Sequence, residues 1–466
     1  MSRIGIGLDF GTSNTTAAIY DGTDIHYIKI DPFTETGTIM PTALYLDREF
    51  SPTVGSEALS RCLKDNTGRK IVMTDKEVGC VTVHMGEMDR DHFIERDRTF
   101  TTVVTGKIDS LLPGRLFRSM KSYLGDKGNP QFDVFGKKFR IEAILTVLLR
   151  YIHNQIRVVT GDLDIHLFIG RPVLYSGTGS DPNRVALERM RTTCTNGGIS
   201  KVSFVMEPEA AAVSYLHSHT NHGSENILVF DFGGGTLDLC ILKRQKEKYS
   251  VLSVSGIARA GDYIDKMIYR KKIFPLLGEG LHRDHDFHFS EFEDNLLNWQ
   301  STYLLNQAEY IEKINHLMKA GGEPEIMAVR LKKLIRGNAS FLLMESIEQA
   351  KIELSSHDST VIDVEEIDLH LEISREELEE IIEPLLGEIS GVISLALARA
   401  ELDSSQVDRI LCTGGSSRIP MVKQHLAHIF GKESEQWDSF RGIAAGLAVA
   451  GFNHFQESKG QTDSES

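Results

Sequence analysis

The sequence predicts an α/β protein of two similar lobes, and three observations support that prediction. The chain has 466 residues, which is too long for one simple core. Segments 6–19 and 228–241, about half the chain apart, both read as strand, Asp-Phe-Gly, short polar turn and second strand. Two Ala- and Gly-rich segments, beginning at Met206 and Asp438, indicate closely packed helices that suit a crossing between lobes. We therefore expect a mixed sheet with helices on both faces in each lobe.

The composition restricts the classes of partner and the compartment. With 51 basic and 66 acidic residues the net charge is −15, and such a surface repels the phosphate backbone of a nucleic acid. The five cysteines are scattered, odd in number and without CxxC spacing, which argues against a disulfide framework or structural zinc. The N-terminus lacks a signal-like apolar stretch, and the small-apolar run near Ala444 is too short to span a bilayer. We expect a cytoplasmic protein with no nucleic-acid or membrane partner.

The repeated turns have the chemistry of phosphate binding. Gly11 in one turn and Gly233, Gly234 and Gly235 in the other remove side chains, so that backbone N–H groups can approach phosphate oxygens. Hydroxyl donors stand beside these glycines in both turns, namely Thr12, Ser13 and Thr236. The two segments read IGLDFGTSNTTAAI and LVFDFGGGTLDLCI.

An aspartate stands at the same place in each copy. Asp9 and Asp231 lie where each strand enters its turn. A carboxylate that faces phosphates is repelled unless a cation lies between them, and Mg²⁺ suits that position. The alternative is a pair of ordinary glycine turns, but the matching aspartates favour a phosphate site. No GxxxxGK[ST] and no GxGxxG after a strand occurs, so a P-loop or dinucleotide fold has no support.

Three other segments leave alternatives open. Residues 409–420 read as a strand ending at Gly414-Gly415-Ser416, where Arg418 could stack on an adenine ring, or as a plain strand-to-helix turn. Residues 296–314 are predicted to be the packed face of a helix. Two groups of histidines allow a metal site, although solvated loops are favoured: His282, His285 and His288, and His217, His219 and His222.

Taken in order, the motifs resemble a known family. LDFGTSNTTAA, VFDFGGGTLDL, CTGGSSRIPMV, MEPEAAAVSY and RGIAAGLAVAG resemble the motifs of the actin-like ATPase superfamily, and within it the DnaK-type heat-shock chaperones. SMKSYLG and IGRPVLYSGTGSD are similar to a truncated YegD-like branch. The resemblance implies an α/β actin-like ATPase fold with a nucleotide cleft between its lobes. Lobe I would hold residues 1–222, with 438–455 returning to it and an outer part at about 39–128. Lobe II would hold 223–437, with an outer helical part at about 259–354, before a disordered tail at 456–466.

The same resemblance implies roles for individual residues. Asp9 and Asp231 would hold hydrated Mg²⁺, Lys121 would bridge the attacking water and the γ-phosphate, and Glu207 would lie beside that water. The terminal phosphates would contact Thr12, Ser13 and Asn14 on one side and Gly233, Gly234, Gly235 and Thr236 on the other. The nucleoside would lie between the helix that carries Glu348, Lys351 and Ser355 and the loop with Gly414, Gly415, Ser416 and Arg418. The turn at Gly261 partly matches a family turn.

The function implied is that of an ATP-binding, chaperone-like ATPase. It would bind ATP or ADP with Mg²⁺, hydrolyse ATP slowly, switch conformation with the nucleotide and act on a protein client or co-chaperone of unknown identity. Family chaperones continue into a peptide-binding domain, which we expect this chain to lack, and segment 172–184 is longer than the family loop that signals to that domain. The alternatives are an actin-like filament protein and a small-molecule kinase of the same superfamily.

Overall fold

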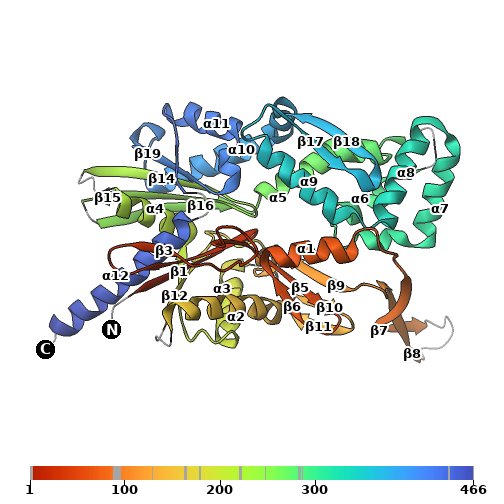
Figure 1. Ribbon diagram of the computed structural model, residues 1–466, viewed down its shortest axis with the longest axis horizontal. Coiled ribbons are helices and arrows are strands. Elements are labelled where there is room, and N and C mark those ends of the chain that lie inside the picture. Colours follow the sequence, from red (N-terminus) through yellow and green to blue (C-terminus); the bar gives the residue numbers. More distant parts are fainter. Residues whose placement is uncertain are drawn as a thin grey trace.

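Two sheets of the same design form the base of the molecule. The computed structural model describes residues 4–87, 96–128, 130–161, 165–177, 180–219, 223–246, 248–281, 285, 287–438 and 441–464. One sheet belongs to the N-terminal half and the other to the C-terminal half, and Figure 1 shows them in separate layers. We refer to the part built on each sheet as lobe I and lobe II.

The sheet of lobe I has the order β13-β12-β1-β2-β3, and β4 also pairs with β2. Strands β1 and β2 form an antiparallel hairpin, while β1 and β12, and then β12 and β13, are parallel. The strand bounds are β1 Gly5–Phe10, β2 Asn14–Tyr20, β3 Ile25–Tyr27, β4 Ile39–Pro41, β12 His166–Arg171 and β13 Lys201–Met206.

The sheet of lobe II repeats that arrangement in the order β16-β15-β14-β19-β20. Strands β14 and β15 are the antiparallel hairpin, and β14 and β19, and then β19 and β20, are parallel. The strand bounds are β14 Ser224–Phe232, β15 Leu237–Gln245, β16 Lys248–Ile257, β19 Arg409–Thr413 and β20 Glu435–Gln436. The sequence repeat therefore corresponds to a repeat of topology, and the predicted fold class is confirmed.

The two Ala- and Gly-rich helices pack closely, as predicted. Helices α4 (Glu207–Ser218) and α12 (Gly442–Ser464) contact each other where a Cβ on Gly446 would lie 1.7 Å from the carbonyl oxygen of Ala210. Helix α12 also lies across β1, so that only glycine fits at Gly7, where a Cβ would meet the oxygen of Ala444 at 2.2 Å. Helix α12 continues to Ser464, so residues 456–464 are helical rather than a disordered tail; no proline interrupts this segment.

Lobe I is completed by two helices and an outer part. Helices α2 (Ile141–Thr160) and α3 (Pro182–Asn196) pack together. The outer part contains α1 (Gly55–Asn66) and a small sheet of order β6-β5-β9, followed by the short helix η1. The remaining bounds are β5 Ala43–Asp47, β6 Pro52–Val54, β7 Met73–Glu87, β8 Arg96–Asp109, β9 Gly114–Arg118, η1 Met120–Tyr123, β10 Gln131–Val134 and β11 Lys137–Arg140. Strands β7 and β8 pair with each other, as do β10 and β11.

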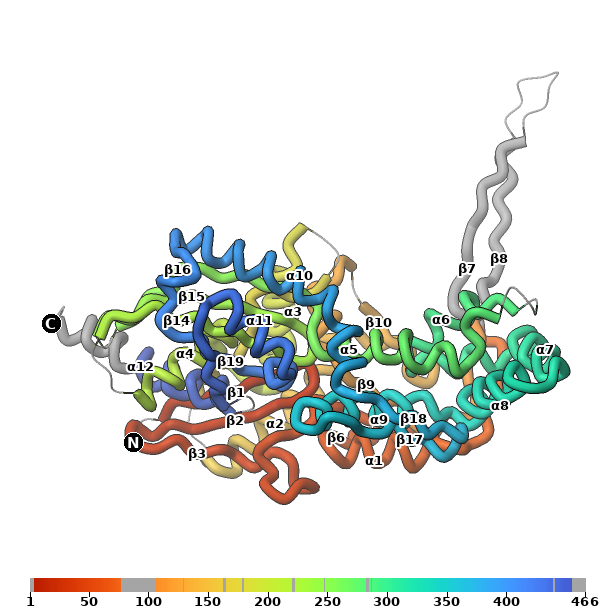
Figure 2. The backbone as a smooth tube through the Cα atoms, turned by 90° about the horizontal axis from the view of Figure 1, so that it is seen from above, coloured from red at the N-terminus to blue at the C-terminus, as the bar shows by residue number. Residues whose placement is uncertain are grey.

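Lobe II carries a larger, mostly helical outer part, which Figure 2 shows extending along the molecule from α5 to α8. Its elements are α5 Gly261–Ile268, α6 Ser290–Leu297, η5 Thr302–Asn306, α7 Ala308–Leu317, α8 Gly322–Arg336, α9 Ser340–Glu353, β17 Ser359–Val364 and β18 Leu369–Ser374. Helices α10 (Arg375–Ala400) and α11 (Pro420–Phe430) follow.

The prediction of one continuous helical face at 296–314 is wrong. Helix α6 ends at Leu297, a turn follows, and η5 and α7 are separate elements. The side-chain oxygen of Asn298 accepts a hydrogen bond from the N–H of Gln300 at 3.2 Å. The backbone carbonyl of Asn298 accepts one from the N–H of Ser301 at 2.8 Å. This local bonding competes with the helix and places Trp299 on a turn.

Helix α10 is, among the described residues, the one helix long and apolar enough to cross a membrane. Its apolar side chains Leu378, Ile382, Ile389 and Ile393 are nevertheless buried, and the helix packs against β15 and β16. These contacts are those of a core helix of lobe II.

Candidate functional site

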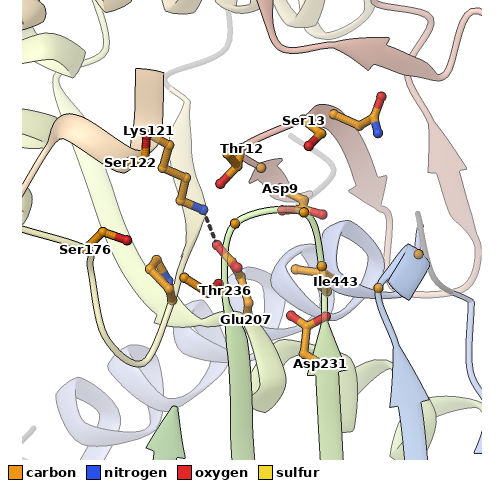
Figure 3. Close-up of a pocket in the computed structure, with 18 of the residues that line it drawn as sticks. Asp9, Thr12, Ser13, Lys121, Ser122, Ser176, Glu207, Asp231, Thr236 and Ile443 are labelled. Atoms are coloured by element: carbon orange, nitrogen blue, oxygen red, sulfur yellow. Dashed lines mark hydrogen bonds and ion pairs between the residues drawn. The ribbon is translucent and has the colours of Figure 1, made fainter. Parts of the chain in front are cut away.

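The two repeated turns face one another across a cavity of about 110 Å³ (Figure 3). Each turn is closed by the same hydrogen bond. The N–H of Gly11 donates to the carbonyl of Asn14 at 3.0 Å, and the N–H of Gly233 donates to the carbonyl of Thr236 at 3.1 Å. The two lobes thus present equivalent turns to the same space.

The glycines bring the turns close together. A Cβ on Gly234 would lie 2.3 Å from Oγ of Ser13, and one on Gly235 would lie 2.8 Å from Oγ1 of Thr12. Bare backbone in lobe II therefore faces hydroxyl groups in lobe I. N–H groups and hydroxyls together make a wall that suits the oxygens of an anion.

Two aspartates lie at the ends of the paired strands. Asp9 stands near the end of β1 and Asp231 near the end of β14, and both line the cavity. Burial, reinforced by Glu207, raises the pKa of Asp9 to about 7 against the opposing effect of Lys121. Burial and the same glutamate raise the pKa of Asp231 well above its ordinary value. Buried carboxylates of this kind are stabilised in the ionised form by a bound cation.

A buried ion pair joins two elements of lobe I beside these aspartates. Lys121, on η1, donates to Glu207, at the start of α4, and Figure 3 shows this contact. Both residues are buried, at 5% and 7% exposure. Burial disfavours the charged amine, but Glu207, Tyr175 and Asp9 outweigh that cost and raise the pKa of Lys121. The ammonium group is thereby kept charged at the edge of the cavity.

The sequence reasoning missed one carboxylate. Asp238, on β15, accepts a hydrogen bond from the N–H of Val173 at 2.7 Å and so ties lobe II to a loop of lobe I. Burial, then the charge of Glu207, raises its pKa to about 7. An aspartate within the otherwise apolar run LDLCIL was a signal that could have identified it. The loop after β12, which also contributes Pro172, Tyr175 and Ser176 to the cavity wall, carried no such signal.

Most of the predicted site residues meet at this cavity. The predicted residues that line it are Asp9, Gly11, Thr12, Ser13, Asn14, Lys121, Glu207, Asp231, Gly233, Gly234, Gly235, Thr236, Gly414 and Gly415. Two others brace the lobe II turn from behind. Gly261 donates its N–H to the carbonyl of Gly233 at 3.1 Å, and Ser416 donates its hydroxyl to the same oxygen at 2.8 Å.

The four remaining residues do not line the cavity. On α9, Lys351 is buried and donates to Asp265 at 2.7 Å, and Glu348 accepts from Arg118 at 2.7 Å. Ser355 lies just beyond the end of α9 and donates its hydroxyl to the carbonyl of Lys351 at 3.5 Å. Arg418 is exposed at the end of a short helix after β19. Their nucleoside-binding role stays a prediction.

The outer parts of the lobes touch above the same cleft. Arg118 of lobe I forms ion pairs with Glu345 and Glu348 of α9. Phe341 of α9 is 6% exposed and belongs to the small apolar core of lobe I's outer part, and Trp299 packs against it with ring centroids 4.7 Å apart. These contacts hold the rim of the cleft together.

Neither histidine group makes a metal centre among the described side chains. In that part of the chain no three His, Cys, Asp or Glu side chains are placed to hold a metal ion by themselves. His282 and His222 lie outside the described residues, so the histidine prediction is examined only for the other four.

Comparison with known proteins identifies a family to which this chain is similar. The family model described as "Hsp70 protein" matches residues 117–272 and 331–454, which is more than half of the chain. The chain is 27% identical over 319 residues to the "Chaperone protein DnaK" of Thermus thermophilus, covering 66% of this chain and 43% of that protein. It is 24% identical over 461 residues to that of Elusimicrobium minutum, covering 96% and 57%. The chain spans about half the length of the curated relatives it matches, and the family match leaves out residues 1–116, 273–330 and 455–466.

Proposed function

Because the chain belongs to the Hsp70 family, we propose that it binds ATP or ADP with Mg²⁺ between the two glycine turns and slowly hydrolyses ATP. The observation that carries the proposal is the pairing of equivalent turns, each with an aspartate at the end of its strand. A phosphate chain that contacts both turns would join the two lobes.

The buried carboxylates fit the metal. Asp9 and Asp231 have raised pKa values because they are buried and lie near Glu207, and a divalent cation would favour their ionised forms. We propose that these two side chains hold hydrated Mg²⁺. The ion would neutralise negative charge on the phosphates.

The chain's own residues would provide the rest of the chemistry. The turns would donate backbone N–H groups and the hydroxyls of Thr12, Ser13 and Thr236 to phosphate oxygens. Lys121 would direct its ammonium group at the terminal phosphate and the attacking water, held in place by Glu207. Hydrolysis of this kind requires positioning and charge stabilisation rather than covalent catalysis.

The nucleoside part of the proposal concerns the other wall of the cleft. Glu348, Lys351, Ser355 and Arg418 would hold the ribose and adenine, with Gly414 and Gly415 close by. In the described structure Glu348 is engaged by Arg118, so we propose that it exchanges part of this ion pair for a ribose hydroxyl when nucleotide binds.

We further propose a conformational switch. The γ-phosphate distinguishes ATP from ADP, and it would contact Thr12 and Ser13 of lobe I and Gly234 and Thr236 of lobe II. Because ATP would make contacts that ADP cannot make, it would favour closure of lobe I on lobe II. Here lobe I comprises residues 1–222 and 438–455, and lobe II comprises residues 223–437. A protein client or co-chaperone in the cytoplasm would respond to the switch. We do not expect this chain alone to bind short extended apolar peptides.

Thermal melting with and without Mg·ADP or Mg·ATP tests the binding step. A ligand at a hundredfold excess over its Kd adds about 2.7 kcal/mol to the free energy of unfolding. No shift at millimolar nucleotide would contradict the site. Phosphate release without any added acceptor then tests hydrolysis, and fluorescence anisotropy with a labelled apolar peptide tests the last expectation, which tight binding would refute.

A further inference from the structure

A second cavity lies away from the glycine turns, and we call it the arginine cavity after Arg48 and Arg115 in its wall. Its volume is about 290 Å³, close to the lower end of the range for small-molecule sites, about 300–1,000 Å³. Lobe I supplies the wall from β7, β8, β9, the segment after β5 and the turn between β10 and β11, and lobe II supplies Tyr303 of η5. Among the described residues, no side chain or backbone lines both this cavity and the first.

Most of this wall lies outside the part of the chain that the family model matches. Arg48, Lys76 and Arg115 fall within residues 1–116, and Tyr303 falls within residues 273–330. The ligand of the arginine cavity therefore does not follow from the family match.

The two arginines carry charge that no carboxylate compensates. Arg48 donates to the backbone carbonyl of Ser110, and Arg115 donates to that of Asp133. Within the described part of the chain, neither guanidinium group forms an ion pair. Burial lowers the pKa of Arg115, although Tyr303 and Asp133 oppose that effect. Each guanidinium group has five N–H donors, so both keep donors for a ligand.

The two carboxylates in the wall are already engaged. Asp109 forms an ion pair with Arg69 and accepts hydrogen bonds from two backbone N–H groups at 3.1 and 3.3 Å. Asp133 forms an ion pair with Lys76 at 3.0 Å and accepts from one backbone N–H at 3.1 Å. With these pairs set aside, the wall retains the two positive charges of the arginines, in a chain whose net charge is −15. An anion would be attracted to this place.

The polar groups of the wall can be reached from solvent. Arg48 is exposed, and Arg115 and Tyr303 are both partly exposed. The hydroxyl of Tyr303 makes no hydrogen bond to any described residue, so it can donate one to a ligand. Donors from both lobes therefore line the same accessible space.

Apolar side chains complete the wall. Ile108, Leu112 and Phe135 line the cavity, and the guanidinium group of Arg48 lies 5.0 Å from the centre of the Phe135 ring. These side chains suit the carbon part of a ligand rather than a bare inorganic ion. Two arginines match the double charge of a phosphate monoester better than the single charge of a carboxylate, and their planar forks suit phosphate oxygens.

We propose that the arginine cavity binds a phosphate monoester of a small organic group. Arg48 and Arg115 bind the phosphate, Tyr303 donates to one of its oxygens, and the organic group lies against Ile108, Leu112 and Phe135. Because donors of both lobes contact one phosphate, the bound ester joins the outer part of lobe I to that of lobe II.

Isothermal titration calorimetry of the full chain with phenyl phosphate tests the ligand class. Benzoate, with a single charge, and benzyl alcohol, with none, are the matched controls. We expect saturable binding of phenyl phosphate, at least tenfold weaker binding of benzoate and no binding of benzyl alcohol. If phenyl phosphate does not bind at millimolar concentration, or if benzoate binds equally well, the proposal is wrong.

Two variants test where phenyl phosphate binds. Arg48→Gln removes one charged donor from an exposed position and should weaken the probe about tenfold. Tyr303→Phe removes only the hydroxyl and should weaken it about threefold. Arg150→Gln is the control, because Arg150 is also exposed and also donates to a backbone carbonyl, that of Asn196 at 2.8 Å. Equal affinity in the Arg48→Gln or the Tyr303→Phe variant would overturn the assignment.

A third variant separates this cavity from the proposed nucleotide site, which also faces phosphate. Thr12→Val removes a hydroxyl from the first cavity and should leave the affinity for phenyl phosphate unchanged. If Thr12→Val weakens the probe and Arg48→Gln does not, the probe binds in the first cavity and the proposal is wrong. ADP is titrated separately, because a chain that binds phenyl phosphate but not ADP contradicts only the nucleotide site.

Discussion

The floor and the rim of the cleft are built differently. The floor is two hairpin turns, each closed within four residues by its own hydrogen bond. The rim is made by contacts between segments far apart in sequence, such as Arg118 with Glu345 and Glu348. Local turns can form with little help from the rest of the chain, whereas the rim exists only when both outer parts are folded and docked.

The two regions also differ in charge. The floor gathers Asp9, Asp231, Asp238 and Glu207 around the ammonium of Lys121, and the pKa values of the three aspartates are raised. At the rim, cationic Arg118 lies between two glutamates, and Glu348 has a lowered pKa because Arg118 and Lys351 outweigh the effect of its burial. The floor thus needs an added cation and the rim does not. The following experiments test that contrast.

The largest effect should come from the floor lysine. Lys121→Ala should lower the single-turnover rate of ATP hydrolysis by about 10²–10³, because the ammonium group acts on charge that develops in the transition state. ADP affinity should change much less. The control is Lys138→Ala on exposed β11. An unchanged hydrolysis rate would show that Lys121 has no catalytic role.

The same substitution leaves Glu207 buried without its partner. Loss of one member of a buried ion pair costs about 3–5 kcal/mol of unfolding free energy. The double variant Lys121→Met with Glu207→Gln should recover part of that stability while remaining inactive. Urea denaturation measures the free energy of unfolding of the single and the double variant. If both variants lose the same amount, the stability does not depend on the pairing of Lys121 with Glu207.

Raised aspartate pKa values predict an unusual pH dependence of the ligand-free protein. Asp9 and Asp238 have pKa values of about 7 in the folded chain against an ordinary 3.8. In the folded chain these two carboxyl groups stay protonated up to about pH 7, whereas in the unfolded chain they ionise near pH 3.8. The stability that their protonated forms contribute is therefore complete below pH 3.8 and is lost as the pH rises through 7. The free energy of unfolding should therefore fall by a few kcal/mol between about pH 5 and pH 8.

Asp238→Asn should flatten that slope, whereas Asp294→Asn, on exposed α6, should not. Saturating Mg·ADP should also flatten it, because the cation favours the ionised aspartates. A stability that rises between these pH values in the ligand-free chain would contradict the electrostatic description of the floor.

A moderate effect is expected at the rim. Arg118→Met keeps the length of the side chain but removes its ion pairs with Glu345 and Glu348. Release of a fluorescent ADP analogue in stopped flow should accelerate about fivefold, which corresponds to about 1 kcal/mol of interlobe contact. Arg140→Met, exposed before α2, is the control. If release does not change, the rim does not limit opening of the cleft.

The smallest effect should come from an ion pair that lies within one lobe. Lys333 of α8 pairs with Asp368, and both side chains are largely exposed. Lys333→Ala should change the free energy of unfolding by less than about 0.5 kcal/mol, because water already solvates both charges. ADP release should match the unmodified chain. If Lys333→Ala accelerated ADP release as much as Arg118→Met does, the difference in solvent exposure would not explain the different effects of the two ion pairs.

The sequence by itself determined the two turns at the floor of the cleft. The pattern strand, Asp-Phe-Gly, turn and strand occurs twice, and it predicted the two hairpins, their glycines and the positions of Asp9 and Asp231. Each of these features depends on residues a few positions apart. The local backbone preferences that form them can therefore be predicted from the sequence.

Tertiary structure alone decided the rest. Without the family resemblance, Lys121 reads as a surface lysine, and only the fold shows it buried against Glu207, 86 residues away. Trp299 reads as part of a helix until the bonding of Asn298 breaks that helix and the opposite lobe supplies its packing. Ion pairing and burial depend on which segments meet in space, and a linear pattern of residues carries no direct record of those distances.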